Sequence, residues 1–80
     1  MKTKPISEEQ RKRLKNLSTF LRELRFNENL TQKEVCHEIN LHRNTLTRIE
    51  NSHNFNIISL FELADFYDIP INQIFLDFEQ

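Results

Sequence analysis

The feature that most constrains the fold is residues 30–50, LTQKEVCHEINLHRNTLTRIE. Thr31 and Glu34 have the spacing of a capping box, in which two side chains satisfy backbone N–H groups at the start of a helix. Asn40 is expected to end that helix, because Asn tolerates the left-handed conformation that a helix C-terminus often needs. The segment therefore begins with a short helix, predicted at about residues 32–39.

The second half of the segment has the pattern of another short amphipathic helix, at about residues 43–51. Leu41 is expected to fill the turn, and Leu46 and Ile49 are expected to face inward. The outward face then carries polar side chains, namely Arg43, Asn44, Thr47 and Arg48. Two helices joined by so short a turn cannot lie parallel, so they are expected to cross steeply as a helix-turn-helix.

A long helix is predicted before this segment. Ser7 and Gln10 form a second capping box, and the two acidic residues between them suit the positive end of a helix. The helix is expected to end near Phe26. Leucines recur along it at helical spacing, at Leu14, Leu17, Leu21 and Leu24.

Two further helices are predicted after the segment. One helix is predicted at about residues 58–67, with one apolar side made of Leu60, Phe61, Ala64 and Tyr67 and of Ile57 just before it. Pro70 disfavours helix at the residue before it and so ends this pattern, and Asn72 is expected to cap a last short helix. Glycine is absent while Asn occurs nine times, which disfavours β-hairpins. The chain is therefore predicted to be all-α, with five helices.

Length and cysteine content limit the kinds of protein that this chain can be. Eighty residues allow one domain, placed at residues 7–80 and preceded by a flexible basic arm at residues 1–6. The apolar runs are too short for a membrane span, and the first residues lead into polar sequence rather than a signal peptide. A single cysteine excludes an internal disulfide and suits a reducing cytoplasm. We therefore expect a cytoplasmic protein that does not enter a membrane.

The distribution of charge divides the chain into two parts, although the net charge is only −1. Residues 1–54 contain all eleven Lys and Arg against seven Asp and Glu, a net charge of +4. Residues 55–80 contain five acids and no base, a net charge of −5. This asymmetry predicts a basic face that meets phosphate and an acidic end that is directed elsewhere.

These patterns resemble the lambda-repressor and Cro-like (XRE-type) family of bacterial and phage helix-turn-helix regulators. Four pieces in order carry the resemblance: LRELR at 21–25, LTQ at 30–32, RIEN at 48–51 and IPINQIF at 69–75. Length and the loop at residues 53–57 also give a weaker likeness to the controller proteins of restriction-modification systems. The resemblance implies a compact, five-helix lambda-repressor-like DNA-binding domain.

The outward face of residues 43–51 is the main candidate for reading DNA bases. An α-helix fits the major groove, where Arg can pair with guanine, Asn with adenine, and a Thr methyl group can touch that of thymine. The alternative is a solvated polar face of the kind that any surface helix has. The resemblance favours base reading, with Arg43, Asn44, Thr47 and Arg48 as the candidates.

Six residues around the two helices are candidates for phosphate contacts. The start of the first helix offers N–H groups and a positive dipole end to phosphate, at Gln32 and Lys33. The resemblance implies a backbone contact for Gln32, and the alternative is simple capping. His42 is expected to cap the second helix, where the family usually has Ser or Thr, and could also contact phosphate. The family often touches phosphate again after the second helix, here at Asn51, His53 and Asn54.

The resemblance also implies roles inside the domain. Arg25 and Glu50 match positions that form a buried ion pair in several family members, which would fix the orientation of the recognition helix. The alternative is two exposed charges that never meet. Cys36 stands where the family usually has Ala, so a buried structural thiol is expected, with a redox sensor as the alternative. The family often has Gly at three positions occupied here by Asn29, Asn40 and Ser52.

Metal binding and catalysis have no convincing candidate in the sequence. His37 and His42 are five residues apart with a predicted helix break between them, so they are expected to point in different directions. No nucleophile–base pair and no Gly-rich phosphate loop is recognisable. We therefore expect no metal, no cofactor and no enzymatic activity.

The C-terminal stretch carries more apolar surface than five small helices can readily bury. We expect a symmetric dimer interface there, made of Ile69, Ile71, Ile74, Phe75, Leu76 and Phe78. The alternative is that these residues complete the core of the monomer.

The function predicted from these features is sequence-specific binding of double-stranded DNA by a homodimeric transcriptional regulator on a (pseudo)palindromic operator. RNA polymerase is a further candidate partner. The alternative is a protein-interaction module, such as an antitoxin-like or adaptor protein, with the acidic C-terminal part as its working surface.

Overall fold

The computed structural model describes the backbone of residues 7–53 and 55–78, and the side chains of residues 7–53 and 55–74. Its described part contains helices and no strand, which confirms the predicted all-α, five-helix class. The helices are α1 (Glu8–Asn27), α2 (Gln32–Glu38), α3 (Arg43–Glu50), α4 (Ile57–Phe66) and α5 (Ile71–Phe78). The arm predicted at residues 1–6 lies outside the described residues.

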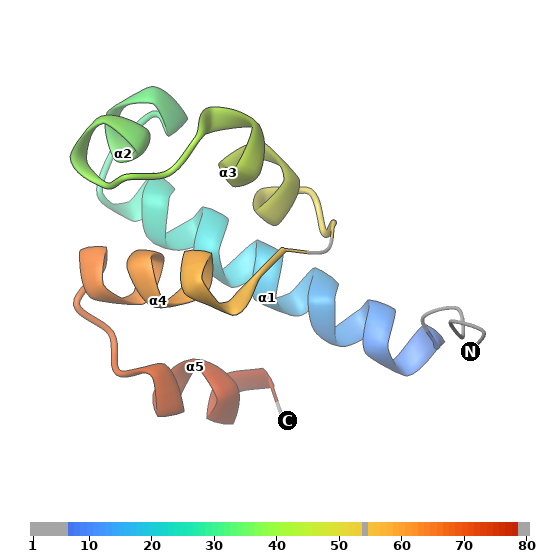
Figure 1. Cartoon of the computed structure of the whole chain (residues 1–80). Coiled ribbons are helices and arrows are strands. Elements are labelled where there is room, and N and C mark those ends of the chain that lie inside the picture. Colours follow the sequence, from blue (N-terminus) through green and yellow to red (C-terminus); the bar gives the residue numbers. More distant parts are fainter. Residues whose placement is uncertain (1–6, 54, 79–80) are drawn as a thin grey trace.

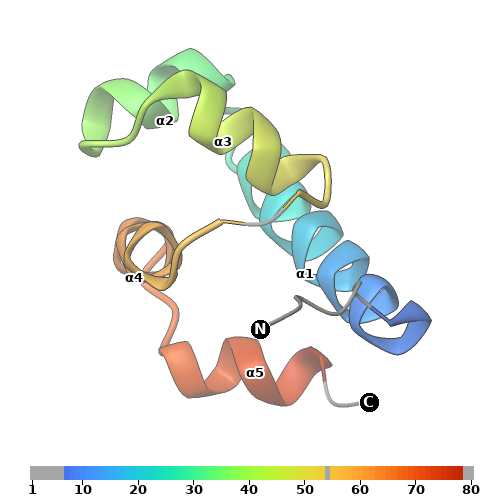
Figure 2. The same ribbon diagram turned by 45° about the vertical axis from the view of Figure 1, so that its right-hand side comes forward.

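The helices are arranged around the long helix α1. Helices α2 and α3 lie on one side of α1 and α4, and α5 lies on the other (Figures 1 and 2). Helix α3 contacts both α1 and α2, while α5 contacts both α1 and α4. At this end of the molecule, α1 therefore holds α3, and α3 holds α2.

Both predicted capping boxes are confirmed. The Ser7 hydroxyl accepts the Gln10 N–H at 3.1 Å, and the Gln10 side chain accepts the Ser7 N–H at 3.1 Å. At the start of α2, the Thr31 hydroxyl accepts the Glu34 N–H at 3.1 Å, and the Glu34 carboxylate accepts the Thr31 N–H at 2.9 Å. This last bond favours the ionised carboxylate and lowers the pKa of Glu34.

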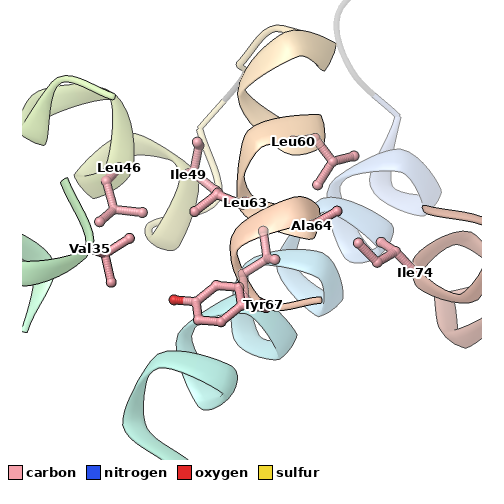
Figure 3. Close-up of a cluster of buried hydrophobic side chains, with 9 residues drawn as sticks. Val35, Leu46, Ile49, Leu60, Leu63, Ala64, Tyr67 and Ile74 are labelled. Atoms are coloured by element: carbon pink, nitrogen blue, oxygen red, sulfur yellow. The ribbon is translucent and has the colours of Figure 1, made fainter. Parts of the chain in front are cut away.

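The core brings together apolar side chains from all five helices. Labelled side chains from α2, α3, α4 and α5 converge in Figure 3. The buried set consists of Leu21, Val35, Leu46, Ile49, Leu60, Leu63, Ala64, Tyr67 and Ile74. A polar link joins α1 to α3, because the fully buried Ser18 hydroxyl donates to the Ile49 carbonyl oxygen.

The end of α2 differs from the prediction. Left-handed backbone occurs at three described residues, Asn29, Ser52 and Asp68, with φ of 57°, 66° and 56°, and Asn40 is not among them. Instead, α2 ends at Glu38 and is followed by Ile39, whose backbone is extended with φ −122° and ψ 157°. The Leu41 N–H then donates to the Ile39 carbonyl oxygen at 2.8 Å. An extended residue thus redirects the chain here, so the turn needs no left-handed residue at Asn40.

The predicted inner face of α4 is partly wrong. Ile57 and Phe61 are 48% and 42% exposed, whereas Leu63, which the prediction omitted, is fully buried. The buried stripe is centred on the line from Leu60 to Tyr67, and Ile57 and Phe61 lie to one side of it. Apolar residues cover more of α4 than its neighbours can bury, so sequence spacing alone could not select the buried face.

The start of α5 also differs from the prediction. Helix α5 begins at Ile71, so Asn72 lies inside it rather than capping it. The Pro70 carbonyl oxygen accepts the Gln73 N–H at 3.0 Å and the Ile74 N–H at 3.4 Å. The helical bonds thus begin from Pro70. No helix in the described part of the chain combines the length and the hydrophobicity of a membrane span.

Candidate nucleic-acid interface

The polar face of α3 is presented to solvent by the packing of its other face. Leu46 and Ile49 are buried at 1% and 0% exposure, which fixes the rotation of the helix. Thr47 is half-buried, and the other three base-reading candidates are exposed, namely Arg43, Asn44 and Arg48. The structure therefore places all four on or beside one accessible face of α3, and α3 lies next to α2 (Figure 1).

The N-terminus of α3 is capped by a histidine. His42 Nδ1 accepts the Asn44 backbone N–H at 3.1 Å, and the imidazole is exposed. Because Nδ1 is an acceptor here, the proton of the neutral ring lies on Nε2, which is then a donor. His42 can therefore cap the helix and still offer one N–H to an anion in front of it.

A buried ion pair connects α1 to the last residue of α3. Arg25 Nε donates to Glu50 Oε2 at 2.8 Å, and Nη2 donates to Glu50 Oε1 at 2.8 Å. Arg25 Nη1 donates to the Leu30 carbonyl oxygen at 2.8 Å. Arg25 is 8% exposed and Glu50 is 3% exposed. The hydrogen bond with Glu50 raises the pKa of Arg25. The geometry is bidentate and directional, so it orients α3 relative to α1.

Two further side chains extend this ion pair toward the surface. Gln32 Nε2 donates to Glu50 Oε1 at 3.2 Å. Thr47 Oγ1 in turn donates to Gln32 Oε1 at 3.1 Å. Sequence reasoning assigned Gln32 to phosphate and Thr47 to bases, and it missed that they contact each other. Side chains fifteen positions apart meet only because α2 and α3 cross, so no local spacing reveals the bond.

Three other phosphate candidates lie on the segments just before and after the turn and α3. Lys33 is exposed in the first turn of α2, and Asn51 and His53 are exposed after α3. The backbone there turns sharply, because Ser52 is left-handed and the His53 N–H donates to the Arg48 carbonyl oxygen at 2.9 Å. Asn54 lies outside the described residues.

Tyr67 lies behind the ion pair, at the end of α4. It is 8% exposed, and its hydroxyl is buried. Desolvation and, next, the negative charge of Glu50 raise the pKa of Tyr67 to about 12. Both effects oppose a second negative charge beside Glu50, so the phenol stays neutral.

Cys36 and the two histidines are arranged as ordinary surface and packing residues. Cys36 is half-buried against the core, and desolvation raises the pKa of its thiol, which disfavours the reactive thiolate. His37 and His42 are both exposed. Within the described residues, no three metal-ligating side chains come together.

The candidates for a dimer interface fall into three groups. Ile74 is fully buried in the core of the monomer, which is the alternative named for it, so it cannot contact a partner directly. Ile69 and Ile71 are half-buried and pack against that core. The side chains of Phe75, Leu76 and Phe78 lie outside the described residues.

The exposed apolar residues of α4 were missed as candidates for an interface. Ile57, Ile58 and Phe61 are 48%, 58% and 42% exposed. The signal was present in the sequence, because residues 57–61 are apolar on too many sides of one helix for a single core to cover.

Comparisons with known proteins agree with this architecture. A family model described as helix-turn-helix matches residues 21–74. Among solved structures, a tyrosine-to-phenylalanine mutant of C.Esp1396I, bound to its highest affinity operator site OM, is similar with a TM-score of 0.72 and 25% identity. The similarity covers 84% of this chain and 90% of that one, and it supports the likeness to the controller proteins. A search of curated proteins finds no match.

Proposed function

The chain belongs to the helix-turn-helix family, and we propose that it is a transcriptional regulator that binds double-stranded DNA as a homodimer. The observation that carries the proposal is the solvent-exposed polar face of α3, whose orientation is fixed by the buried pair of Arg25 and Glu50. The operator-bound state of C.Esp1396I, which shares this fold, supports the proposal.

In this proposal α3 enters the major groove with its N-terminal part foremost. Arg43 pairs with the acceptors of guanine, and Asn44 pairs with the acceptor and donor of adenine. Thr47 and Arg48 contact the bases that follow. Phosphates on either side are held by Lys33, His42, Asn51, His53 and Asn54, and by the second N–H of the Gln32 amide.

The proposed homodimer places two copies of α3 about 34 Å apart, one turn of the DNA helix, on a (pseudo)palindromic operator. Its interface combines the C-terminal residues Phe75, Leu76 and Phe78 with the exposed apolar residues of α4. Bound in this way at a promoter, the protein would regulate transcription by blocking RNA polymerase or by contacting it.

Selection of bound duplexes from a random pool of double-stranded DNA tests the proposal. We expect a palindromic site, and an association constant that falls linearly with salt on a logarithmic scale because bound counterions are released. Failure to enrich any site, or an affinity that does not change with salt, would contradict DNA binding. It would favour the protein-interaction module instead.

Arg43→Ala gives the sharper test of base reading. We expect it to weaken binding by about 1–3 kcal/mol and to relax specificity at one base position. Arg13→Ala is the matched control, because it removes the same charge from an exposed site on α1. Competition titrations against single-base variants of the selected site measure both effects. Equal weakening for every sequence would make Arg43 a phosphate contact.

A further inference from the structure

A chain of hydrogen bonds runs from the buried ion pair to the DNA-facing side of α3. Glu50 Oε1 accepts from both Arg25 and Gln32, at 2.8 and 3.2 Å. The other end of the Gln32 amide accepts the Thr47 hydroxyl at 3.1 Å. Gln32 and Thr47 are half-buried, whereas Arg25 and Glu50 are buried. Three successive hydrogen bonds, from Arg25 to Glu50, Gln32 and Thr47, thus connect the interior to the surface.

The direction of every bond in this chain follows from its buried end. Arg25 donates to both oxygens of the Glu50 carboxylate, so Glu50 presents only acceptors. Gln32 must therefore turn its NH₂ group toward Glu50, which leaves its oxygen facing Thr47. An amide oxygen can only accept, so the Thr47 hydroxyl has to donate its one proton to Gln32.

We propose that the Arg25–Glu50 pair, acting through Gln32, makes Thr47 a base-selecting residue that offers DNA only acceptor lone pairs and a methyl group. This inference rests on the proposed function and deepens it, because it names the bases that one position of α3 accepts. Gln32 is a positioning residue in this arrangement, and Thr47 is the residue that contacts the base.

The chemistry of the major groove converts this polarity into a base preference. Adenine and cytosine each present an amino group that can donate to the Thr47 oxygen, and thymine presents a methyl group for the Thr47 methyl. Guanine presents only the acceptors N7 and O6. With its proton committed to Gln32, Thr47 has nothing to donate to them. The base facing Thr47 is therefore adenine, cytosine or thymine, and guanine is rejected.

Two substitutions separate the hydroxyl from the residue that orients it. Thr47→Val keeps the shape and the methyl group but removes the oxygen, so the preference for adenine or cytosine is lost while guanine stays excluded. Gln32→Met keeps the length of the side chain but frees the Thr47 hydroxyl to rotate and donate. Guanine at the same position should then gain about three- to tenfold relative to the other bases, the worth of one hydrogen bond.

The experiment is selection from a random double-stranded DNA pool with the full chain and its variants, followed by titration of the four bases at the position that Thr47→Val alters. Thr45→Val is the matched control, because it makes the same chemical change at a half-buried residue of α3 outside this chain of bonds. It should leave the base frequencies at that position unchanged. Thermal unfolding checks that each variant folds, and Gln32→Ala replaces Gln32→Met if the latter does not.

The outcomes distinguish this inference from the proposed function. A wild-type chain that enriches no site contradicts DNA binding itself. A wild-type chain that enriches a site but prefers guanine at the Thr47 position overturns the inference alone. So does Gln32→Met if it weakens binding to all four bases by the same factor, since Gln32 would then act only on phosphate or on the fold.

Discussion

The α2–α3 half and the α4–α5 half of this small domain are held in place by different forces. The first half is oriented by directional polar contacts: the capping box of α2, the pair of Arg25 and Glu50, and the bonds of Gln32. The second half contributes most of the buried apolar side chains and leaves Ile57, Ile58 and Phe61 exposed. The proposed base-reading surface needs fixed angles, which hydrogen bonds supply. The proposed surface between two copies needs apolar area.

The strongest test of this contrast is to remove one member of the ion pair. Arg25→Met would leave the Glu50 carboxylate buried without its main partner, and we expect the free energy of unfolding to fall by about 3–5 kcal/mol. Denaturant unfolding measures the change. Glu9→Ala is the control, because it breaks the exposed pair with Arg13 and should cost less than about 1 kcal/mol.

The double variant Arg25→Met/Glu50→Met separates orientation from stability. With both charges gone, most of the lost stability should return, since apolar residues often replace a buried ion pair at little cost. Base preference at the Thr47 position should still relax, because Gln32 has lost the carboxylate that orients it. If stability recovered while the base preference at the Thr47 position stayed unchanged, the Arg25–Glu50 pair would not determine whether the Thr47 hydroxyl donates or accepts.

The same contrast explains what could be predicted from sequence. The capping boxes and the helices they start depend on residues three apart, so Ser7–Gln10 and Thr31–Glu34 were identified correctly. The end of α2 was not, because Ile39 is extended there. Its β-branched side chain favours that conformation, but its spacing from Val35 is that of one helix face and predicted a further helical residue. The bond between Gln32 and Thr47 depends on how two helices cross, and the exposure of Ile57 and Phe61 depends on how much neighbouring surface is available.

Tyr67 provides a test where the two halves meet. Its pKa is raised to about 12 by burial and by Glu50, whereas an exposed tyrosine in the unfolded chain titrates near 10. As pH rises, the Tyr67 hydroxyl is therefore deprotonated in the unfolded chain before it is in the folded one. The free energy of unfolding is unaffected by this group below pH 10, and it falls as pH rises from 10 to 12. We expect denaturant unfolding to show that the free energy of unfolding falls by about 1–3 kcal/mol between pH 10 and pH 12. Tyr67→Phe should remove that part of the pH dependence, and an unchanged slope would place the titration elsewhere.

The exposed side of α4 should control association rather than folding. Phe61→Ser removes a side chain that is 42% exposed in the monomer, so the unfolding free energy of the monomer should fall by less than the about 3–5 kcal/mol that truncation of a fully buried Phe costs. The dissociation constant of the proposed dimer should rise about tenfold or more if this side chain lies in the interface. Sedimentation equilibrium measures it, with Gln73→Ser at an exposed polar position of α5 as the control. An unaltered constant would confine the interface to the C-terminal residues.

The smallest expected effect concerns the loop that joins the two halves. Ser52 has a φ of 66° and Asn29 has a φ of 57°, but their side chains tolerate this conformation differently. A left-handed residue with a Cβ is strained by about 1–2 kcal/mol, and Asn relieves part of that strain by local hydrogen bonding. Ser52→Gly should therefore raise the free energy of unfolding by about 1 kcal/mol, and Asn29→Gly should raise it less. Denaturant unfolding of the two variants compares them directly. If Asn29→Gly gave the larger gain, the strain would lie before the helix-turn-helix rather than after it.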